Sequence, residues 1–501
     1  MGVRLTRRAL LRAGGIAAAS GPLLAATRAT ADEPHATNPA DLSLLEILTG
    51  LESRRLSAVE LTEACIARID ALEPTIQAFV TRTDERALAA AETADRQRAR
   101  GQDPGLLGGV PVGLKDLVYT KGVATTAGSR TLADFVPDFD ATLWARMAEE
   151  GAGLAGKLNT HEFAYGTSTP PTRNPWAPSR NPGGSSGGSG AALGARMLPV
   201  ATGSDTGGSL RLPAAVNGIC AIRPTYGVVS RRGIIALAWS LDTVAPMARR
   251  MADVALLLDT VAGRDPQDPT SAETPLGELP LDPPGLDGVR IGVPDTYFWE
   301  DVEPGIEAAC RDGLALLERL GAEVVEVPVP AVNDEVMAIY GPFERTVFTE
   351  ATSYHRGLVR SERAAGYSPE ILALLADGET ITAADYLDDQ RMRSVYSRQW
   401  REIFAEHRID AFAHPTTPEQ PKPQVPSESF LFGVPFRLMR TAPMCGFPSL
   451  SVPVGFDGDL PVGLCLTGLA FDDARLLGIG VAVDEEVALW QVRPPLVEEL
   501  G

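Results

Sequence analysis

The sequence contains little lysine, which makes each lysine informative. Only four of its 45 basic residues are Lys, and the others are Arg. Arg keeps its proton at accessible pH, whereas burial can lower the pKa of a Lys until it serves as a base. Lys115 follows the apolar run of GVPVGLKDL (109–117) and is the candidate base. We interpret the other three as structural or surface residues: Lys157 as structural, and Lys121 and Lys422 as surface.

An ion pair between Lys115 and the adjacent Asp116 is the competing interpretation. Neighbouring side chains on a strand point to opposite faces, which makes that pair unfavourable. We therefore expect Lys115 to lie buried without Asp116 as its partner.

Cysteine and histidine are also scarce. The five cysteines show no CxxC spacing and lie mostly in apolar surroundings (Cys65, Cys220, Cys310, Cys445 and Cys465). This pattern predicts buried free thiols and excludes a disulfide framework or a zinc site. We expect no metal ion and no cofactor.

Positive charge is in deficit, with a formal net charge of −20. An acidic protein is repelled by phosphate backbones and by anionic lipid. We therefore expect no nucleic acid partner, no stable membrane association and only a small molecule as ligand. The oligomeric state stays open.

The N-terminal segment 1–31 has the layout of a signal peptide. It begins with basic residues, continues with small uncharged ones and ends in Ala29-Thr30-Ala31, and Arg7-Arg8 gives it the twin-arginine form. Its apolar run falls short of the roughly 20 residues that a membrane span needs. We expect cleavage after Ala31 and export of the folded chain, residues 32–501, to the periplasm or the medium.

Two glycine-serine clusters stand within Gly183–Arg211, separated by the apolar run 191–201. A single cluster of this kind is typical of a linker. Glycine also lets a backbone approach another group closely, as a site built from N–H donors requires. The apolar run predicts a buried helix leading into a strand, so we expect both clusters to serve one site.

Strand and helix patterns alternate along the chain. Ser57 and Glu60 form a capping box ahead of a helix that should end near Pro74. VRIGVP (289–294), an amphipathic run over 303–320 and AEVVEVPVP (322–330) predict strand, helix and strand. The pattern indicates a layered α/β fold in one domain.

Several blocks together resemble the amidase signature family: GVPVGLKDL (109–117), the serine-glycine block, GSDTGGSLRLPAAVNGICAIRPTYG (203–227), SLDTVAPMARRMADVALLLDTVAG (240–263) and FPSLSVPVGFDGDLPVGLCLTG (447–468). The resemblance implies one domain with a central mixed, twisted sheet covered by helices on both faces. It also implies hydrolysis of a small carboxylic amide to an acid and ammonia or an amine.

The resemblance assigns three catalytic roles. Ser209 matches the nucleophile that carries the acyl group, Ser185 the bridging serine preceded by a cis peptide, and Lys115 the base. The backbone N–H groups from Thr206 through Gly207 and Gly208 to Ser209 would hold the oxyanion. Ser186 and Asp205 match positions that support the two loops, and Arg211 is interpreted as structural.

Three alternatives remain. The A subunit of a tRNA-dependent amidotransferase shares the signature, although EILALLADGE (370–379) lacks the basic residue that those subunits carry in this helix. An esterase with a Ser-His-Asp triad is possible because the serine block satisfies GxSxG, but none of His355, His407 and His414 stands in a triad-like setting. A secreted, non-catalytic binding protein is the third. The acyl group and the roles of His161 and Trp239 stay unassigned.

Overall fold

Strands from both halves of the chain join in one mixed sheet. The computed structural model describes residues 38–273, 276–330, 340–424 and 434–500, so the expected signal peptide 1–31 lies outside the described residues. The sheet order is β1-β3-β2-β4-β6-β5-β10-β11-β9-β7-β8. The strands are β1 (Phe79–Arg82), β2 (Pro111–Lys115), β3 (Gly153–Leu158), β4 (Val200–Asp205), β5 (Cys220–Arg223), β6 (Thr243–Ala248), β7 (Arg290–Pro294), β8 (Glu323–Val327), β9 (Ala411–Pro415), β10 (Ser449–Asp457) and β11 (Leu460–Thr467).

Parallel pairs lie toward both edges of this sheet and antiparallel pairs form its centre. β2 runs parallel to β3 and β4, and β7 runs parallel to β8 and β9. From β4 through β6, β5, β10 and β11 to β9 every pair is antiparallel. The α/β class and the mixed sheet predicted from the sequence are confirmed.

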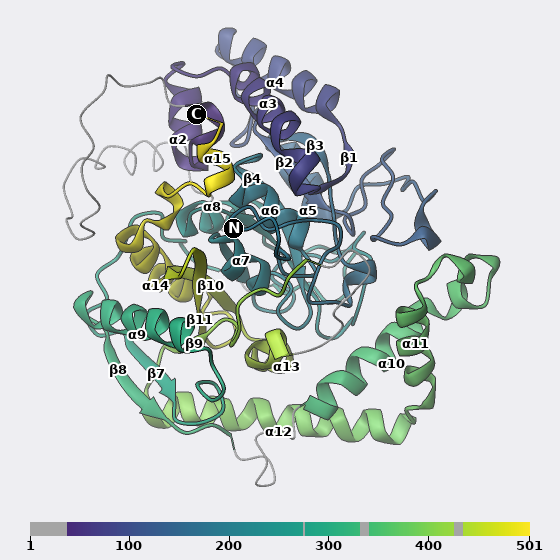
Figure 1. Cartoon of the computed structure of the whole chain (residues 1–501), viewed down its shortest axis with the longest axis vertical. Helices are drawn as coiled ribbons and strands as arrows, with labels where there is room; N and C mark the ends of the chain where they lie inside the picture. The colour runs from purple at the N-terminus through teal and green to yellow at the C-terminus, as the bar shows by residue number, and fades with distance from the viewer. Residues whose placement is uncertain (1–37, 274–275, 331–339, 425–433, 501) are drawn as a thin grey trace.

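Helices cover both faces of the sheet. They are α2 (Leu44–Glu52), α3 (Ala58–Ile76), α4 (Asp84–Ala99), α5 (Thr142–Glu149), α6 (Gly187–Gly194), α7 (Arg211–Asn217), α8 (Met251–Val261), α9 (Pro304–Arg319), α10 (Tyr340–Val359), α11 (Pro369–Thr380), α12 (Ala383–His407), α13 (Thr441–Cys445), α14 (Asp473–Val487) and α15 (Pro495–Glu498). Helices α2 to α4 gather at one end of the molecule, and α10, α11 and α12 form an arm at the other (Figure 1).

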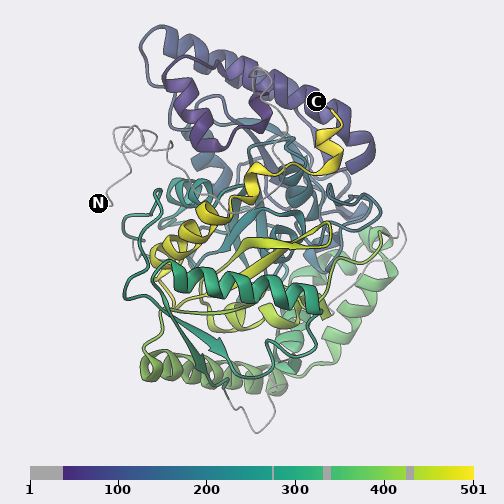
Figure 2. The ribbon, with the colours of Figure 1, turned by 60° about the vertical axis from the view of Figure 1, so that its left-hand side comes forward.

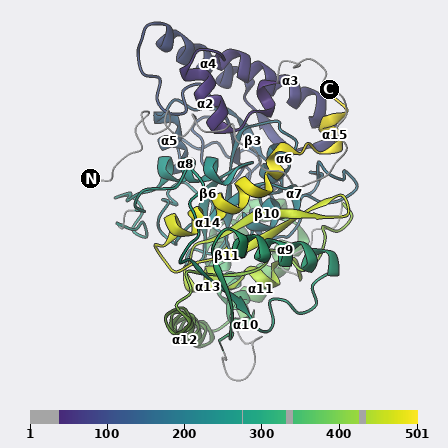
Figure 3. The ribbon, with the colours of Figure 1, turned by 90° about the vertical axis from the view of Figure 1, so that its left-hand side faces the viewer.

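Side chains that alternate along the central strands build a separate core on each face. On β4, Val200 belongs to the buried cluster that includes residues of α8, α9 and α14, whereas its neighbour Ala201 belongs to the cluster that includes residues of α6 and α7. β6 repeats this alternation with Val244 and Ala245. Figures 2 and 3 show α9 and α14 together on one face. Because successive strand side chains point to opposite faces, strands buried on both sides are mostly apolar, and the exceptions on β2, β3 and β4 are Lys115, Lys157, Thr202, Ser204 and Asp205.

Local sequence signals set several element boundaries. The capping box is present: the Ser57 hydroxyl accepts from the Glu60 N–H at 3.1 Å, and the Glu60 carboxylate accepts from the Ser57 N–H at 2.8 Å. Helix α3 passes Pro74 and ends two residues later, because a proline in the last turn costs it only one backbone hydrogen bond. The predicted strand, helix and strand after residue 288 are β7, α9 and β8.

The five cysteines are free and buried, as predicted. Within the described ranges, no helix combines the length and hydrophobicity that a bilayer span needs. Nor does that part of the chain bring three or more His, Cys, Asp or Glu side chains together in a way that could hold a metal ion.

Candidate active site

Lys115 lies at the end of β2 with its ammonium nitrogen inside the protein. The residue is fully buried, and Nζ lies 2.7 Å from the Ser185 hydroxyl, 2.9 Å from that of Ser186 and 2.8 Å from that of Ser204. Three hydroxyl groups therefore surround this nitrogen, and none of these close contacts is to a carboxylate. Ser204 is a neighbour that the sequence analysis missed.

The environment of Lys115 favours its neutral form. Burial lowers the pKa of Lys115 from its ordinary value of 10.5 to about 7, against the opposing influence of Asp205 and Asp242. A large fraction of the amine is therefore unprotonated near neutral pH and can accept a proton through its lone pair.

This pKa predicts the pH dependence of the reaction. If neutral Lys115 is the base, kcat/KM should rise about tenfold per pH unit below pH 7 and become level above it. The rate rises with pH because only the deprotonated amine of Lys115 can act as the base. Initial rates between pH 5 and 9, on protein shown to stay folded across that range, measure this. A flat profile from pH 5.5 to 8 contradicts it.

Ser185 lies between β3 and α6, in the first glycine-serine cluster. The Gly184–Ser185 peptide bond is cis. The Ser185 carbonyl accepts hydrogen bonds from the His161 N–H at 3.2 Å and from the Thr169 hydroxyl at 3.3 Å. These contacts fix the backbone that aims the Ser185 hydroxyl at Lys115.

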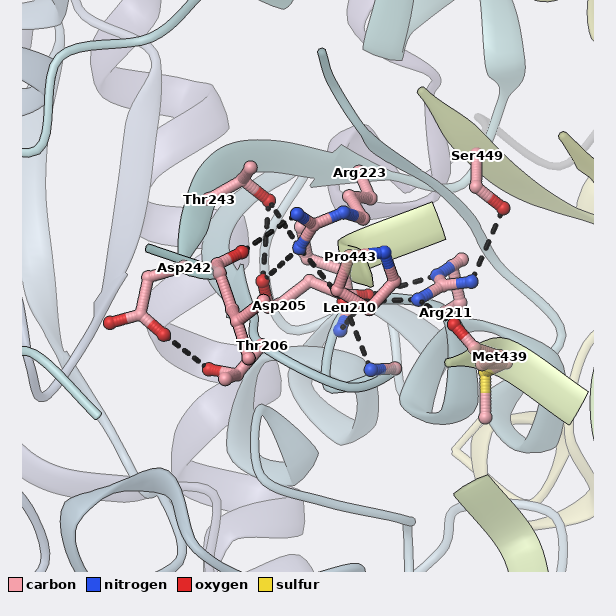
Figure 4. Close-up of polar contacts among 12 residues, drawn as sticks. Asp205, Thr206, Leu210, Arg211, Arg223, Asp242, Thr243, Met439, Pro443 and Ser449 are labelled. Carbon is pink, nitrogen blue, oxygen red and sulfur yellow. Dashed lines mark hydrogen bonds and ion pairs between the residues drawn. The ribbon is translucent and has the colours of Figure 1, made fainter. Parts of the chain in front are cut away.

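Ser209 lies in the second cluster, on the loop between β4 and α7. Asp205 organises this loop from beneath by accepting the Gly208 N–H at 2.9 Å and the Leu210 N–H at 3.3 Å (Figure 4). Ser209 is 2% exposed.

Two arginines compensate the charge of Asp205. Arg211 pairs with it at 3.0 Å and Arg223 at 3.4 Å, and all three side chains are fully buried (Figure 4). Burial alone raises the pKa of Asp205, but the two guanidinium groups and the loop N–H groups hold it below its ordinary value. Removing one partner of such a buried set costs about 3–5 kcal/mol. Arg211 is thus structural, as expected.

The second cluster needs glycine for steric reasons. Gly208 has a φ of 138°, and a Cβ there would come within 2.9 Å of Phe436 and Met439. A Cβ on Gly207 would lie 2.7 Å from the Phe343 ring. The Gly208 N–H already donates to Asp205, so the expectation that it holds an oxyanion changes. Thr206, Gly207 and Ser209 remain the candidate donors.

Asp242 is a second buried carboxylate that the sequence analysis missed. It accepts the Thr206 hydroxyl at 2.6 Å and the N–H groups of Leu237 and Ala238 at 2.9 and 3.1 Å. The loop is thereby held by two carboxylates: Asp205 binds the N–H groups of Gly208 and Leu210, and Asp242 binds the Thr206 hydroxyl.

Lys157 and Asp116 form a buried ion pair at 3.4 Å. The Lys157 Nζ also donates to the Val118 carbonyl at 2.6 Å and to the Thr125 hydroxyl at 2.7 Å. Asp116 therefore faces away from Lys115, and Lys157 is structural, as the sequence predicted.

His161 is buried beside the bridging serine. Burial lowers the pKa of this imidazole to about 4, with Lys115 adding to the effect, so the ring is neutral. Its ring packs against Gly166, where a Cβ would lie 2.1 Å from the imidazole. Its backbone contact to Ser185 makes it a support for the first cluster.

Known proteins share this sequence pattern and this fold. A family model described as Amidase matches residues 60–477. The A subunit of glutamyl-tRNA(Gln) amidotransferase from Chloroflexus aggregans is 42% identical over 473 residues, covering 89% of this chain and 96% of that protein.

Two solved structures are similar throughout. The same subunit from Thermotoga maritima has a TM-score of 0.76 and 31% identity, with 90% of this chain and 95% of that one covered. The peptide amidase of Stenotrophomonas maltophilia has a TM-score of 0.79 and 31% identity, with 90% and 98% covered.

These relatives correct one sequence-based expectation. The acidic charge led us to expect no nucleic acid partner and only a small-molecule ligand. That expectation is wrong, because the relatives that match over nearly their full length are named as subunits of an enzyme acting on a charged tRNA. Net charge averages over a whole surface, so it does not exclude a chain from an assembly that handles nucleic acid.

Proposed function

The chain belongs to the amidase signature family, and from this premise we propose that it cleaves the C–N bond of a carboxylic amide by transferring the acyl group to Ser209. The observation that carries the proposal is the buried Lys115, whose Nζ lies 2.7 Å from the Ser185 hydroxyl and whose pKa is lowered to about 7. A neutral amine among hydroxyl groups is suited to receive a proton.

Acylation begins when the Ser209 Oγ attacks the amide carbonyl carbon. The Ser209 proton passes to the Ser185 Oγ, and the Ser185 proton passes to the Lys115 Nζ. The tetrahedral intermediate carries its negative charge on the former carbonyl oxygen. In this proposal the N–H groups of Thr206, Gly207 and Ser209 donate to it, and each donor of this kind contributes roughly 3–4 kcal/mol.

The leaving group then receives the proton. Lys115 returns it through Ser185 to the amide nitrogen, the C–N bond breaks, and ammonia or an amine departs from acyl-Ser209. Water then attacks the ester carbonyl and passes its proton through Ser185 to Lys115. The proton returns to the Ser209 oxygen as the acid is released. Ser204 and Ser186 hold the Lys115 nitrogen in place throughout.

Two settings share this chemistry. The curated relatives favour the alternative raised from the sequence, the A subunit of an amidotransferase, over a free-standing amide hydrolase. In that setting the amide donor is glutamine and partner subunits use the ammonia. A free-standing hydrolase draws its support from the peptide amidase fold match and from helix α11, whose segment 370–379 carries no basic residue.

The esterase alternative has no support in the described part of the chain. His355 Nδ1 contacts the Tyr367 hydroxyl at 2.7 Å, and His414 Nδ1 contacts the Pro415 carbonyl at 2.8 Å. Neither contact is the imidazole–carboxylate bond that a Ser-His-Asp triad needs.

A panel of amide donors tests the proposal. Ammonia release from glutamine, butyramide and 4-phenylbutyramide is measured with the purified chain, with and without hydroxylamine. We expect ammonia from at least one donor and its hydroxamate when hydroxylamine is present, because hydroxylamine intercepts an acyl-enzyme. Absence of both products from all three donors contradicts the proposal. Glutamine as the best donor favours the amidotransferase setting.

A further inference from the structure

A cavity of about 260 Å³ lies next to the loop that carries Ser209. Its lining comes from the segment before β6, from residues 267–269 after α8 and from α10, and it includes Arg231, Trp239, Asp242, Glu350 and Tyr354. This volume is close to the lower end of small-molecule sites and accommodates one ring with a few further atoms.

The cavity and the catalytic loop share Asp242. This carboxylate lines the cavity, and it also accepts the Thr206 hydroxyl at 2.6 Å. Thr206 is one of the candidate oxyanion donors. Asp242 therefore belongs both to the cavity lining and to the contacts that hold the catalytic loop.

Helix α10 connects the same two places. Phe343 packs against Gly207, while Glu350 and Tyr354 line the cavity. These three positions, seven and four residues apart, lie on one face of a helix. At 1.5 Å per residue, the step from Phe343 to Glu350 is roughly 10 Å. One helix face therefore contacts both the catalytic loop and the cavity.

Two charged side chains of the cavity, Glu350 and Arg231, have hydrogen-bond partners within the protein. Glu350 accepts the Ser240 N–H at 2.8 Å and the Tyr386 hydroxyl at 2.7 Å. Arg231 donates to the Tyr226 hydroxyl at 2.6 Å and to the Trp239 carbonyl. Both carboxylate oxygens of Glu350 and both terminal nitrogens of Arg231 are thus used inside the protein.

Aromatic surface remains available. Trp239 is 59% exposed and Tyr354 is 45% exposed. The Arg231 guanidinium lies 5.8 Å from the centre of the Trp239 ring and steadies it. Tryptophan is a large apolar side chain that is usually buried, so an exposed indole beside a cavity is unusual. Its ring is suited to stacking on a planar group.

We propose that this cavity is a subsite for an aromatic group on the amide donor, on the side of the catalytic loop where Asp242 holds Thr206. The inference rests on the function proposed above. Apolar side chains at the catalytic loop agree with it, since Phe343, Phe436 and Met439 pack against Gly207 and Gly208. Binding energy gained by the remote ring would then contribute to positioning the carbonyl.

Paired substrates test the subsite. The ratio of kcat/KM for 4-phenylbutyramide to that for butyramide is measured in the wild type, in Trp239→Ala and in Trp299→Ala. Trp299 is a matched control because it is half-buried beneath Arg311, at 3.8 Å, and is not among the cavity residues. We expect the ratio to fall about tenfold in Trp239→Ala, the loss of one aromatic contact, and to stay at the wild-type value in the control.

An unchanged ratio in Trp239→Ala overturns the subsite but not the proposed amide cleavage. A wild-type preference for butyramide or glutamine over 4-phenylbutyramide has the same consequence. If the wild type cleaves no amide, the proposed function is wrong, and the subsite is tested by binding instead. Calorimetry then compares the affinity for 4-phenylbutyrate of the Ser209→Ala variant with that of the double variant Ser209→Ala, Trp239→Ala. Weaker binding in the double variant then supports the subsite, whereas equal or absent binding overturns it.

Discussion

Replacing Ser209 by Ala should lower kcat by about 10⁶-fold, the loss seen when a serine nucleophile acting as part of a relay is removed. The variant should also form no hydroxamate in the presence of hydroxylamine, because no acyl-enzyme exists to intercept. Ser209 lies in a loop held by Asp205 and Asp242 through other residues, so the fold should survive the loss of one hydroxyl. Ammonia release and thermal unfolding measure the two effects.

Ser394→Ala is the matched control for this prediction. Its hydroxyl bonds back to the Gln390 carbonyl at 2.9 Å on the exposed surface of α12, so the substitution should leave the rate and the melting temperature near the wild-type values. Ser209→Ala protein that melts normally and still releases ammonia within tenfold of the wild type would assign the nucleophile to another residue.

Local signals in the sequence predicted the elements better than they predicted the contacts between them. The Ser57 capping box located the start of α3, and the apolar run before Lys115 predicted that this lysine is buried. Both signals lie within a few residues of the feature that they predict. The cavity lining, in contrast, joins residues more than 100 positions apart.

The missed site residues depend on strand register. Val112 of β2 pairs with Val200 of β4, which brings the end of β2 beside Ser204, although 89 residues separate Lys115 from Ser204. Asp205 of β4 pairs with Thr243 of β6, and the next residue of one strand, Thr206, therefore lies beside the preceding residue of the other, Asp242. Neither contact can be predicted from a single sequence, because the strand register is fixed only when distant strands pair.

Lys115→Arg should reduce kcat/KM by 10²- to 10⁴-fold, the range typical of losing a general base. Arg has a similar length, but its positive charge is permanent and it cannot accept a proton near neutral pH. The hydroxyl oxygens of Ser185, Ser186 and Ser204 could still accept hydrogen bonds from a guanidinium at this position, so a purely structural role for Lys115 forecasts a much smaller loss. Lys115→Ala, which also lacks a base, should be about equally inactive.

Lys157→Arg provides the comparison that separates chemistry from packing. Lys157 is as fully buried as Lys115 and lies on the neighbouring strand β3, but it pairs with Asp116, and an arginine can keep that pair. Both substitutions enlarge a buried side chain and should lower the melting temperature, whereas only the one at position 115 should abolish turnover by the folded protein. Because the loss at Lys115 reflects a missing proton acceptor, raising the pH to 9 should not restore it. Near-normal turnover by Lys115→Arg, or recovery at pH 9, would mean that the proton from Ser185 goes elsewhere.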